Sequence, residues 1–131
     1  MDVGEIFMLA LLVDDSKTTR MILGDMLRQL GFEVAEAANG REGIERLKRL
    51  KAHLVLIDWN MPDLNGLEFV RAVRADQSYA GLHLLMVTSE EDQGQIATAL
   101  KAGADEYIRK PFTKEVILEK LQRLGLTPAS S

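Results

Sequence analysis

The sequence has no cysteine and no excess of positive charge. Without cysteine, the chain forms no disulfide framework, no zinc site with thiolate ligands and no cysteine nucleophile. Lysine and arginine total 16 against 20 aspartate and glutamate residues, a formal charge of −4. This balance argues against nucleic-acid binding, which usually requires a basic surface.

The sequence also has no apolar run long enough to span a bilayer. The run at 6–13 is far shorter than a transmembrane helix requires. It follows Asp2 and Glu5 instead of a basic stretch, and it ends at Asp14 and Asp15, so it does not resemble a secretory signal peptide. We therefore expect a cytoplasmic protein that does not contact the membrane.

The overall composition is that of a folded domain. Apolar residues make up 47% of the 131 residues and charged residues 27%, which is typical of a globular chain. This length suits one hydrophobic core. We expect a single domain over residues 1–131, with a core at about 7–125 and a short tail at 126–131.

Short apolar runs alternate with segments of helical periodicity along the whole chain. The five runs lie at 7–13, 32–37, 54–57, 82–87 and 106–108. Several are almost continuously apolar, which is typical of parallel strands covered on both faces. Strand–helix units with right-handed crossovers predict a doubly wound α/β sandwich with five parallel strands.

Helix signals support the same pattern. In the first helix, one apolar stripe is expected from Met21, Ile22, Met26, Leu27 and Leu30. Gly31 follows as a stop signal.

Two later helices carry the spacing of a capping box. The pairs are Asn39 with Glu42 and Asn65 with Glu68.

Polar side chains follow four of the expected strands directly. Asp14 and Asp15 follow the first strand, Asp58 the third, Thr88 the fourth and Lys110 the fifth. Ligands of doubly wound sheets bind at the carboxyl ends of the strands, where the strand order reverses. With the order 2-1-3-4-5, the three carboxylates would converge, with the hydroxyl and the ammonium opposite them.

Such a cluster of carboxylates, a hydroxyl and an ammonium suits phosphoryl transfer. Clustered carboxylates need a counter-charge, which a divalent cation such as Mg²⁺ supplies. An aspartate can accept a phosphoryl group, whose oxygens then need a cation and a hydrogen-bond donor. Each residue alone also has a structural explanation, as a helix cap, a turn former or a surface lysine. Their meeting at one edge of the sheet favours the functional interpretation.

The stretches VDDS, LIDWNMPDLNG, LMVTSEE and GADEYIRKPF, in this order, resemble a receiver domain of two-component signalling. The resemblance covers about residues 7–125. Within the family, DWNMP, LMVT and YIRKPFT are most similar to the stand-alone chemotaxis regulators. The resemblance implies a flavodoxin-like sheet in the order 2-1-3-4-5. It also implies a signalling switch with no enzymatic activity beyond its own phosphorylation and autodephosphorylation.

The resemblance assigns a metal site that holds Mg²⁺, with Mn²⁺ as a substitute. It implies that Asp58 is the phosphoacceptor, which takes a phosphoryl group from a histidine kinase or a phosphotransfer domain. Asp15, Asp58 and the main-chain carbonyl of Asn60 match the direct metal ligands, and Asp14 matches a ligand acting through water.

The resemblance assigns further roles around the phosphoryl group. Lys110 matches the lysine that contacts a phosphoryl oxygen, and its bond to Pro111 is expected to be cis. Thr88 matches the switch hydroxyl, and Tyr107 the aromatic residue whose ring turns inward as Thr88 moves. Gly66 is expected to shape the loop that opens the third helix.

Asn60 and Glu90 match the two positions that tune the lifetime of the phosphoryl group. Both residue types resemble those of chemotaxis regulators, so we expect a short-lived switch.

The resemblance places the output surface on the fourth helix, fifth strand and fifth helix. It includes Ile96, Ala99, Asp105, Tyr107, Arg109 and Lys120. A protein partner such as a flagellar motor switch is expected there. The protein is expected to be a monomer or a phosphorylation-dependent dimer.

Two alternatives remain open from the sequence. The chain could be the excised receiver of a longer regulator with a DNA-binding or enzymatic output domain. It could also be a small Mg²⁺-dependent phosphatase that works through an aspartyl-phosphate. Such phosphatases usually carry an Asp-X-Asp motif and a cap domain, whereas Asp14 and Asp15 are adjacent here.

Overall fold

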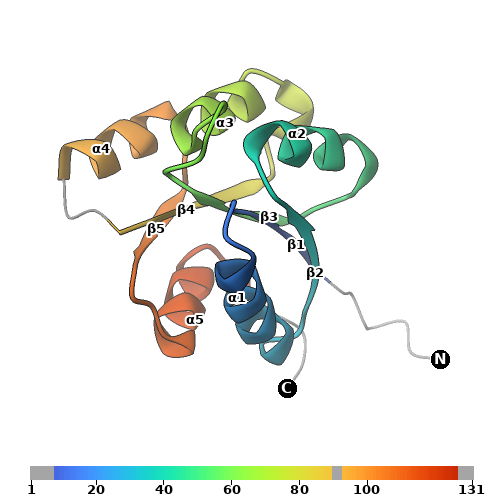
Figure 1. The fold of residues 1–131 in the computed structure, drawn as a ribbon, viewed down its shortest axis with the longest axis vertical. Coiled ribbons are helices and arrows are strands. Elements are labelled where there is room, and N and C mark those ends of the chain that lie inside the picture. The colour runs from blue at the N-terminus through green and yellow to red at the C-terminus, as the bar shows by residue number, and fades with distance from the viewer. Residues whose placement is uncertain (1–7, 90–92, 127–131) are drawn as a thin grey trace.

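The computed structural model describes residues 8–89 and 93–126 (Figure 1). The strands are β1 (Met8–Val13), β2 (Phe32–Ala37), β3 (Leu54–Asp58), β4 (His83–Thr88) and β5 (Glu106–Arg109). The helices are α1 (Lys17–Gln29), α2 (Gly40–Arg49), α3 (Gly66–Arg74), α4 (Gln93–Ala102) and α5 (Lys114–Arg123). A 3₁₀ turn, η1 (Gln77–Tyr79), precedes β4. No helix within the described ranges is both long and apolar enough to cross a membrane.

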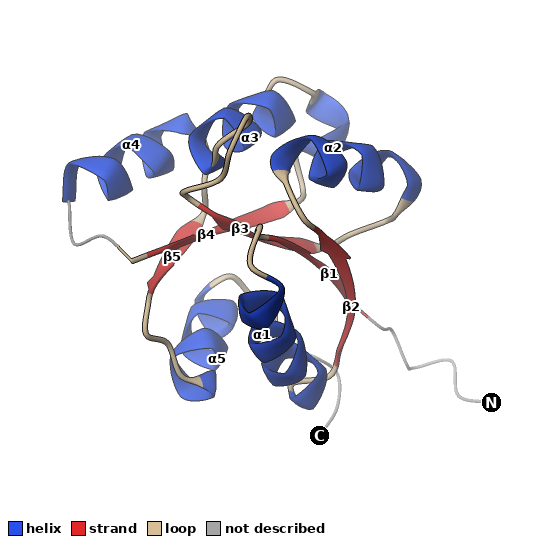
Figure 2. Ribbon diagram, in the orientation of Figure 1, coloured by secondary structure: helices blue, strands red, loops and turns tan. Residues whose placement is uncertain are grey.

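The five strands form one parallel sheet in the order β2-β1-β3-β4-β5. Helices α2, α3 and α4 cover one face, and α1 and α5 cover the other (Figure 2). This confirms the predicted doubly wound architecture and its strand order. The order reverses between β1 and β3, so a site is expected at their carboxyl ends.

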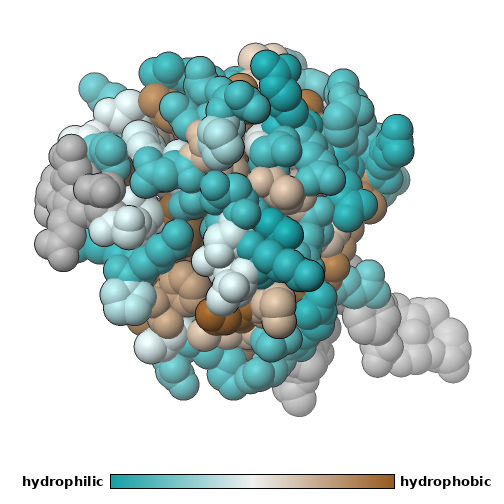
Figure 3. All heavy atoms as spheres, viewed as in Figure 1, coloured by the Kyte–Doolittle hydropathy of each residue, from teal (hydrophilic) through white to brown (hydrophobic). Residues whose placement is uncertain are grey.

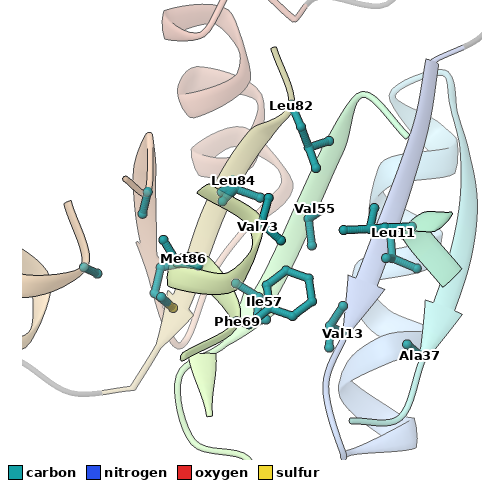
Figure 4. Close-up of a cluster of buried hydrophobic side chains, with 14 of the residues drawn as sticks. Leu11, Val13, Ala37, Val55, Ile57, Phe69, Val73, Leu82, Leu84 and Met86 are labelled. Atoms are coloured by element: carbon teal, nitrogen blue, oxygen red, sulfur yellow. The ribbon is translucent and has the colours of Figure 1, made fainter. Parts of the chain in front are cut away.

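The core lies in two layers, one on each face of the sheet. In the first, Phe69 of α3 packs among Val13, Ile57 and Met86 from three strands (Figure 4). In the second, Leu23 of α1 and Leu121 of α5 belong to one buried cluster. Hydrophilic side chains predominate on the face shown in Figure 3. Apolar groups are thus removed from water on both faces, and their close packing makes the sheet rigid. The residues at the ends of its strands are therefore held in fixed positions.

The stripe predicted for α1 is wrong in part. Met21 and Ile22 are 57% and 45% exposed, while Leu23, Gly24 and Leu27 are buried. Apolar residues occupy more than half of the circumference of this helix, and only one arc can face the sheet. The arc that contains Leu23, Gly24 and Leu27 does so.

The predicted helix starts are confirmed with one difference. Asn65 and Glu68 form the full capping box of α3. Asn39 caps α2 through the main-chain N–H of Glu42, but the Glu42 carboxylate accepts from the Ala38 N–H instead of the Asn39 N–H. After α1, Gly31 has a φ of 98°, a conformation that suits glycine.

Candidate functional site

The carboxyl edge of the sheet presents the polar residues that the sequence singles out. Asp58 and Thr88 are the last residues of β3 and β4, and Asp58 pairs in register with Val87. Asp14 follows β1, and Lys110 follows β5. Parallel strands end on the same side, so side chains more than 40 positions apart in sequence meet at one edge.

Three carboxylates converge at this edge. One oxygen from each of Asp14, Asp15 and Asp58 lies within 4.8 Å of the other two. Asp14 is 2% exposed and Asp58 6%, whereas Asp15 is exposed. Asp14 Oδ1 accepts a hydrogen bond from the Ser16 N–H at 2.8 Å. The buried Asp14 Oδ2 has no partner among the described residues. Carboxylate oxygens are the ligands that hard divalent cations prefer. A buried carboxylate oxygen without a hydrogen-bond donor is available to bind such a cation.

Burial and repulsion between carboxylates disfavour the charged forms of Asp14 and Asp58. Desolvation is the main cause that raises the pKa of Asp58 to about 6, and the charges of Asp14 and Asp15 add to it, while Lys110 opposes them. Desolvation also raises the pKa of Asp14, against a hydrogen bond from the Ser16 N–H. A bound cation would reverse this balance, because it stabilises carboxylates over carboxylic acids.

Lys110 places a positive charge beside Asp58. Its Nζ lies 3.4 Å from Asp58 Oδ1. Its main-chain N–H donates to the Thr88 carbonyl at 2.8 Å, which ties the end of β5 to that of β4. The Lys110–Pro111 bond is cis, the isomer that the resemblance implies. Thr88 is buried at the end of the strand between β3 and β5.

The loop after Asp58 folds back onto the end of β3. The Gly66 N–H donates to the Trp59 carbonyl at 3.0 Å. A Cβ at Gly66 would lie 2.6 Å from the Asp58 carbonyl oxygen, so no other residue fits without a shift of the backbone. Asn60 is exposed in this loop, and Trp59 is half-buried against the core. Glycine thus allows α3 to begin directly against the acidic edge.

Arg20 belongs to the site, although the sequence analysis did not identify it. Its Nη1 donates to the main-chain carbonyl of Asp14 at 2.6 Å, and its Nε pairs with Glu36 at 2.8 Å. It therefore links the loop after β1 to β2. The available signal was a cation six residues after Asp14, at the start of a helix that leaves the acidic edge.

The structure describes some, but not all, of the expected switch and output residues. Tyr107 lies on β5, half-buried, in register with Met86 of β4. Glu90 lies outside the described residues. Ala99 was expected on the output surface, but it is buried in the core. A small side chain there allows α4 to pack closely on the rest of the layer.

Comparisons with known proteins agree with this geometry. The family model described as "Response regulator receiver domain" matches residues 10–122. The chain belongs to the response regulator receiver domain family. The chemotaxis protein CheY1 of Helicobacter pylori (strain J99) is 47% identical over 114 residues, which cover 86% of this chain and 92% of the relative.

Solved structures of receivers resemble this one. The Vibrio cholerae chemotaxis protein CheY4 is 35% identical with a TM-score of 0.85, over 90% of this chain and 98% of that chain. The receiver domain of a Pseudomonas aeruginosa sensor histidine kinase has a magnesium ion coordinated in its active site cleft. It is 29% identical with a TM-score of 0.81, over 90% of this chain and 97% of that chain.

Family and site together give the general function. This receiver domain is a phospho-accepting signalling switch with an acidic pocket formed by Asp14, Asp15 and Asp58. It is not a classical enzyme.

Proposed function

We propose that Asp58 is the residue that accepts the phosphoryl group, from the phosphohistidine of a histidine kinase or a phosphotransfer domain. The observation that carries the proposal is the position of Asp58. It is nearly buried at the end of β3, with two carboxylates within 4.8 Å and Lys110 Nζ at 3.4 Å. A residue at this point has both an acidic group for a metal and a cation for the incoming phosphoryl oxygens.

We propose Mg²⁺ as the cofactor, with Mn²⁺ as a substitute. Asp14, Asp15, Asp58 and the main-chain carbonyl of Asn60 would hold it, in agreement with the unsatisfied Asp14 oxygen and the oxygen-only donor set. When bound, the cation neutralises the carboxylates and the negative charge of the phosphoryl group.

The chain's own residues carry the transfer. A bond forms between an Asp58 carboxylate oxygen and phosphorus as the bond from phosphorus to the histidine nitrogen breaks, and the donor histidine keeps that electron pair. Lys110 shifts from Asp58 to a phosphoryl oxygen. Thr88 donates its hydroxyl to another oxygen, and Tyr107 responds to the movement of Thr88. Asn60 and Glu90 control the attack of water and give a short lifetime.

Phosphorylation is tested by incubating the full chain with Mg²⁺ and a small-molecule phosphodonor, followed by intact mass measurement. We expect one added phosphoryl group, which chelation of the metal prevents. The adduct should be absent in Asp58→Asn and present in Asp63→Asn. Asp63 makes a suitable control because it is exposed in the same loop and has a φ of 67°, which asparagine tolerates. An unmodified parent protein, or an adduct in Asp58→Asn, would contradict the proposal.

We propose that residues 1–131 form a single cytoplasmic receiver domain with a chemotaxis-type role. Its output surface on α4, β5 and α5 would then contact a protein partner such as a flagellar motor switch, without nucleic acid or membrane. The support is the likeness to chemotaxis proteins over most of the chain.

The position of Asp105 favours a monomer after phosphorylation. Its Oδ2 accepts from Arg74 Nη2 at 2.9 Å and from the Leu84 N–H at 2.8 Å. Arg74 also donates to the carbonyls of Gly103, Tyr79 and Leu82. These bonds within the chain compete with any salt bridge from Asp105 across a dimer. Light scattering should show an unchanged molar mass when the phosphodonor is added, and a doubled mass would contradict the expectation.

A further inference from the structure

The ring of Tyr107 lies against cations from two elements. Lys120 Nζ of α5 is 4.3 Å from the ring centroid, and Arg109 Cζ of β5 is 5.7 Å from it. Both distances are within the range of cation–π attraction, which is stronger when the cation is partly removed from water. The Lys120 side chain is only 14% exposed. Its ammonium is therefore partly removed from water, which strengthens its attraction to the ring.

Glu106 holds Lys120 in this position. The Lys120 Nζ donates to Glu106 Oε1 at 3.1 Å, and Arg123 Nη1 lies 3.6 Å from Glu106 Oε2. Glu106 Oε1 also accepts from the Tyr107 main-chain N–H at 3.2 Å. The Glu106 side chain is 17% exposed. Despite this burial, the bond from Lys120 and the N–H of Tyr107 keep its pKa below the usual range, so it is charged at neutral pH.

The position of β5 makes this arrangement possible. Tyr107 packs against the core layer under α2, α3 and α4, whereas α5 contributes to the opposite layer. Since β5 is the edge strand of the sheet, a long side chain from α5 can pass the edge and reach a ring that belongs to the other layer. The ring of Tyr107 is thereby connected to both layers.

We propose that Glu106 is a positioning residue that holds the Lys120 ammonium on the Tyr107 ring and so opposes rotation of that ring toward Thr88. The proposal rests on the switching of Thr88 and Tyr107 given under Proposed function, and it adds a regulator of that step. Each ring rotation must break the contact with Lys120. Loss of Glu106 frees Lys120 to move into water, and the equilibrium between ring orientations shifts by about fivefold toward the rotated form.

The experiment uses the full chain labelled with 3-fluorotyrosine and observed by ¹⁹F NMR. The sequence has two tyrosines, so Tyr79 serves as an internal reference beside Tyr107. The variant Glu106→Gln keeps the size of the side chain and an acceptor for the Tyr107 N–H, but it removes the negative charge that holds Lys120 and Arg123. The variant Lys120→Gln removes the cation itself. The matched control is Glu119→Gln, which removes an exposed carboxylate of α5 that pairs with Arg123 and not with Lys120.

Spectra are recorded before and after addition of Mg²⁺ and a phosphodonor, with intact mass as the measure of phosphorylation. In Glu106→Gln and Lys120→Gln without phosphodonor, the Tyr107 signal should lie part-way toward the position that it takes in the phosphorylated parent. The double variant should show no further shift, and Tyr79 should not respond. Glu119→Gln should match the parent.

The outcomes separate the two proposals. A Tyr107 signal unchanged by either variant, or moved equally by Glu119→Gln, would overturn the role of Glu106. Absence of a phosphoryl adduct in the parent would overturn the proposed function. In that case, a displaced Tyr107 signal in the variants without phosphodonor would still support the contact of Lys120 with the ring.

Discussion

Replacing Asp58 by asparagine should stabilise the metal-free protein at pH 7.5. Burial and the neighbouring carboxylates raise the pKa of Asp58 from 3.8 to about 6, so the folded state resists its ionisation. Each pKa unit corresponds to about 1.4 kcal/mol, and the free energy of unfolding should rise by of the order of 2–3 kcal/mol in the variant. The opposing effect of Lys110 is already contained in that pKa. The Asp58 carboxylate, which serves the proposed function, therefore lowers the stability of the metal-free protein.

The sign of the pH dependence follows from the same shift. The unfolded chain releases the Asp58 proton near pH 4, and the folded protein near pH 6. Between these values the folded state binds more protons, so a rise in pH lowers the free energy of unfolding of the parent. Below about pH 4 both states are protonated and the penalty is absent. The advantage of Asp58→Asn should thus grow from about pH 4 to pH 6 and remain constant above it.

Urea denaturation of both proteins across this pH range, with a chelator present, measures the effect. Asp63→Asn, at an exposed position of the same loop, serves as the control and should unfold like the parent. Added Mg²⁺ should stabilise the parent more than Asp58→Asn, since a ligand stabilises the state that binds it. A variant less stable than the parent without metal at pH 7.5 would show that Asp58 is held by favourable contacts instead of under electrostatic strain.

Replacing Gly66 by alanine should damage both stability and the acidic site. The new Cβ would lie 2.6 Å from the Asp58 carbonyl oxygen, 2.9 Å from Trp59 Cα and 3.0 Å from Met86 Sδ. Two of these atoms belong to the main chain and cannot rotate away, so α3 must move from the end of β3. Overpacking of this kind costs about 1–3 kcal/mol. Displacement of the Asp58 backbone should also weaken Mg²⁺ binding, roughly tenfold for a loss of about 1.4 kcal/mol.

Gly81→Ala is the matched control for this substitution. A Cβ at Gly81 meets nothing within 4 Å, and its φ is not in the left-handed region. Its stability should change by no more than about 0.5 kcal/mol. Urea denaturation gives the stability, and titration of the Trp59 fluorescence with Mg²⁺ gives the affinity. Equal effects of the two alanines would show that the contact between Gly66 and the end of β3 has no special role.

Local patterns were sufficient to predict most of the architecture. The apolar runs identify all five strands, though β3, β4 and β5 each extend one residue further, to Asp58, Thr88 and Arg109. Asn65 with Glu68 predicts the start of α3 because a capping box depends only on residues three positions apart. The residues that follow the strands were identified because parallel strands must end at one edge.

The sequence by itself determined the alternation of strands and helices, the helix starts and the acids and lysine at the strand ends, because each depends on a few neighbouring residues. Only the tertiary structure decided which arc of α1 is buried, and it exposed Met21 and Ile22. It also decided the partners of distant charges, pairing Arg74 with Asp105 and Lys120 with Glu106. These contacts depend on how the helices pack on the two faces of the sheet, and no local periodicity specifies that packing.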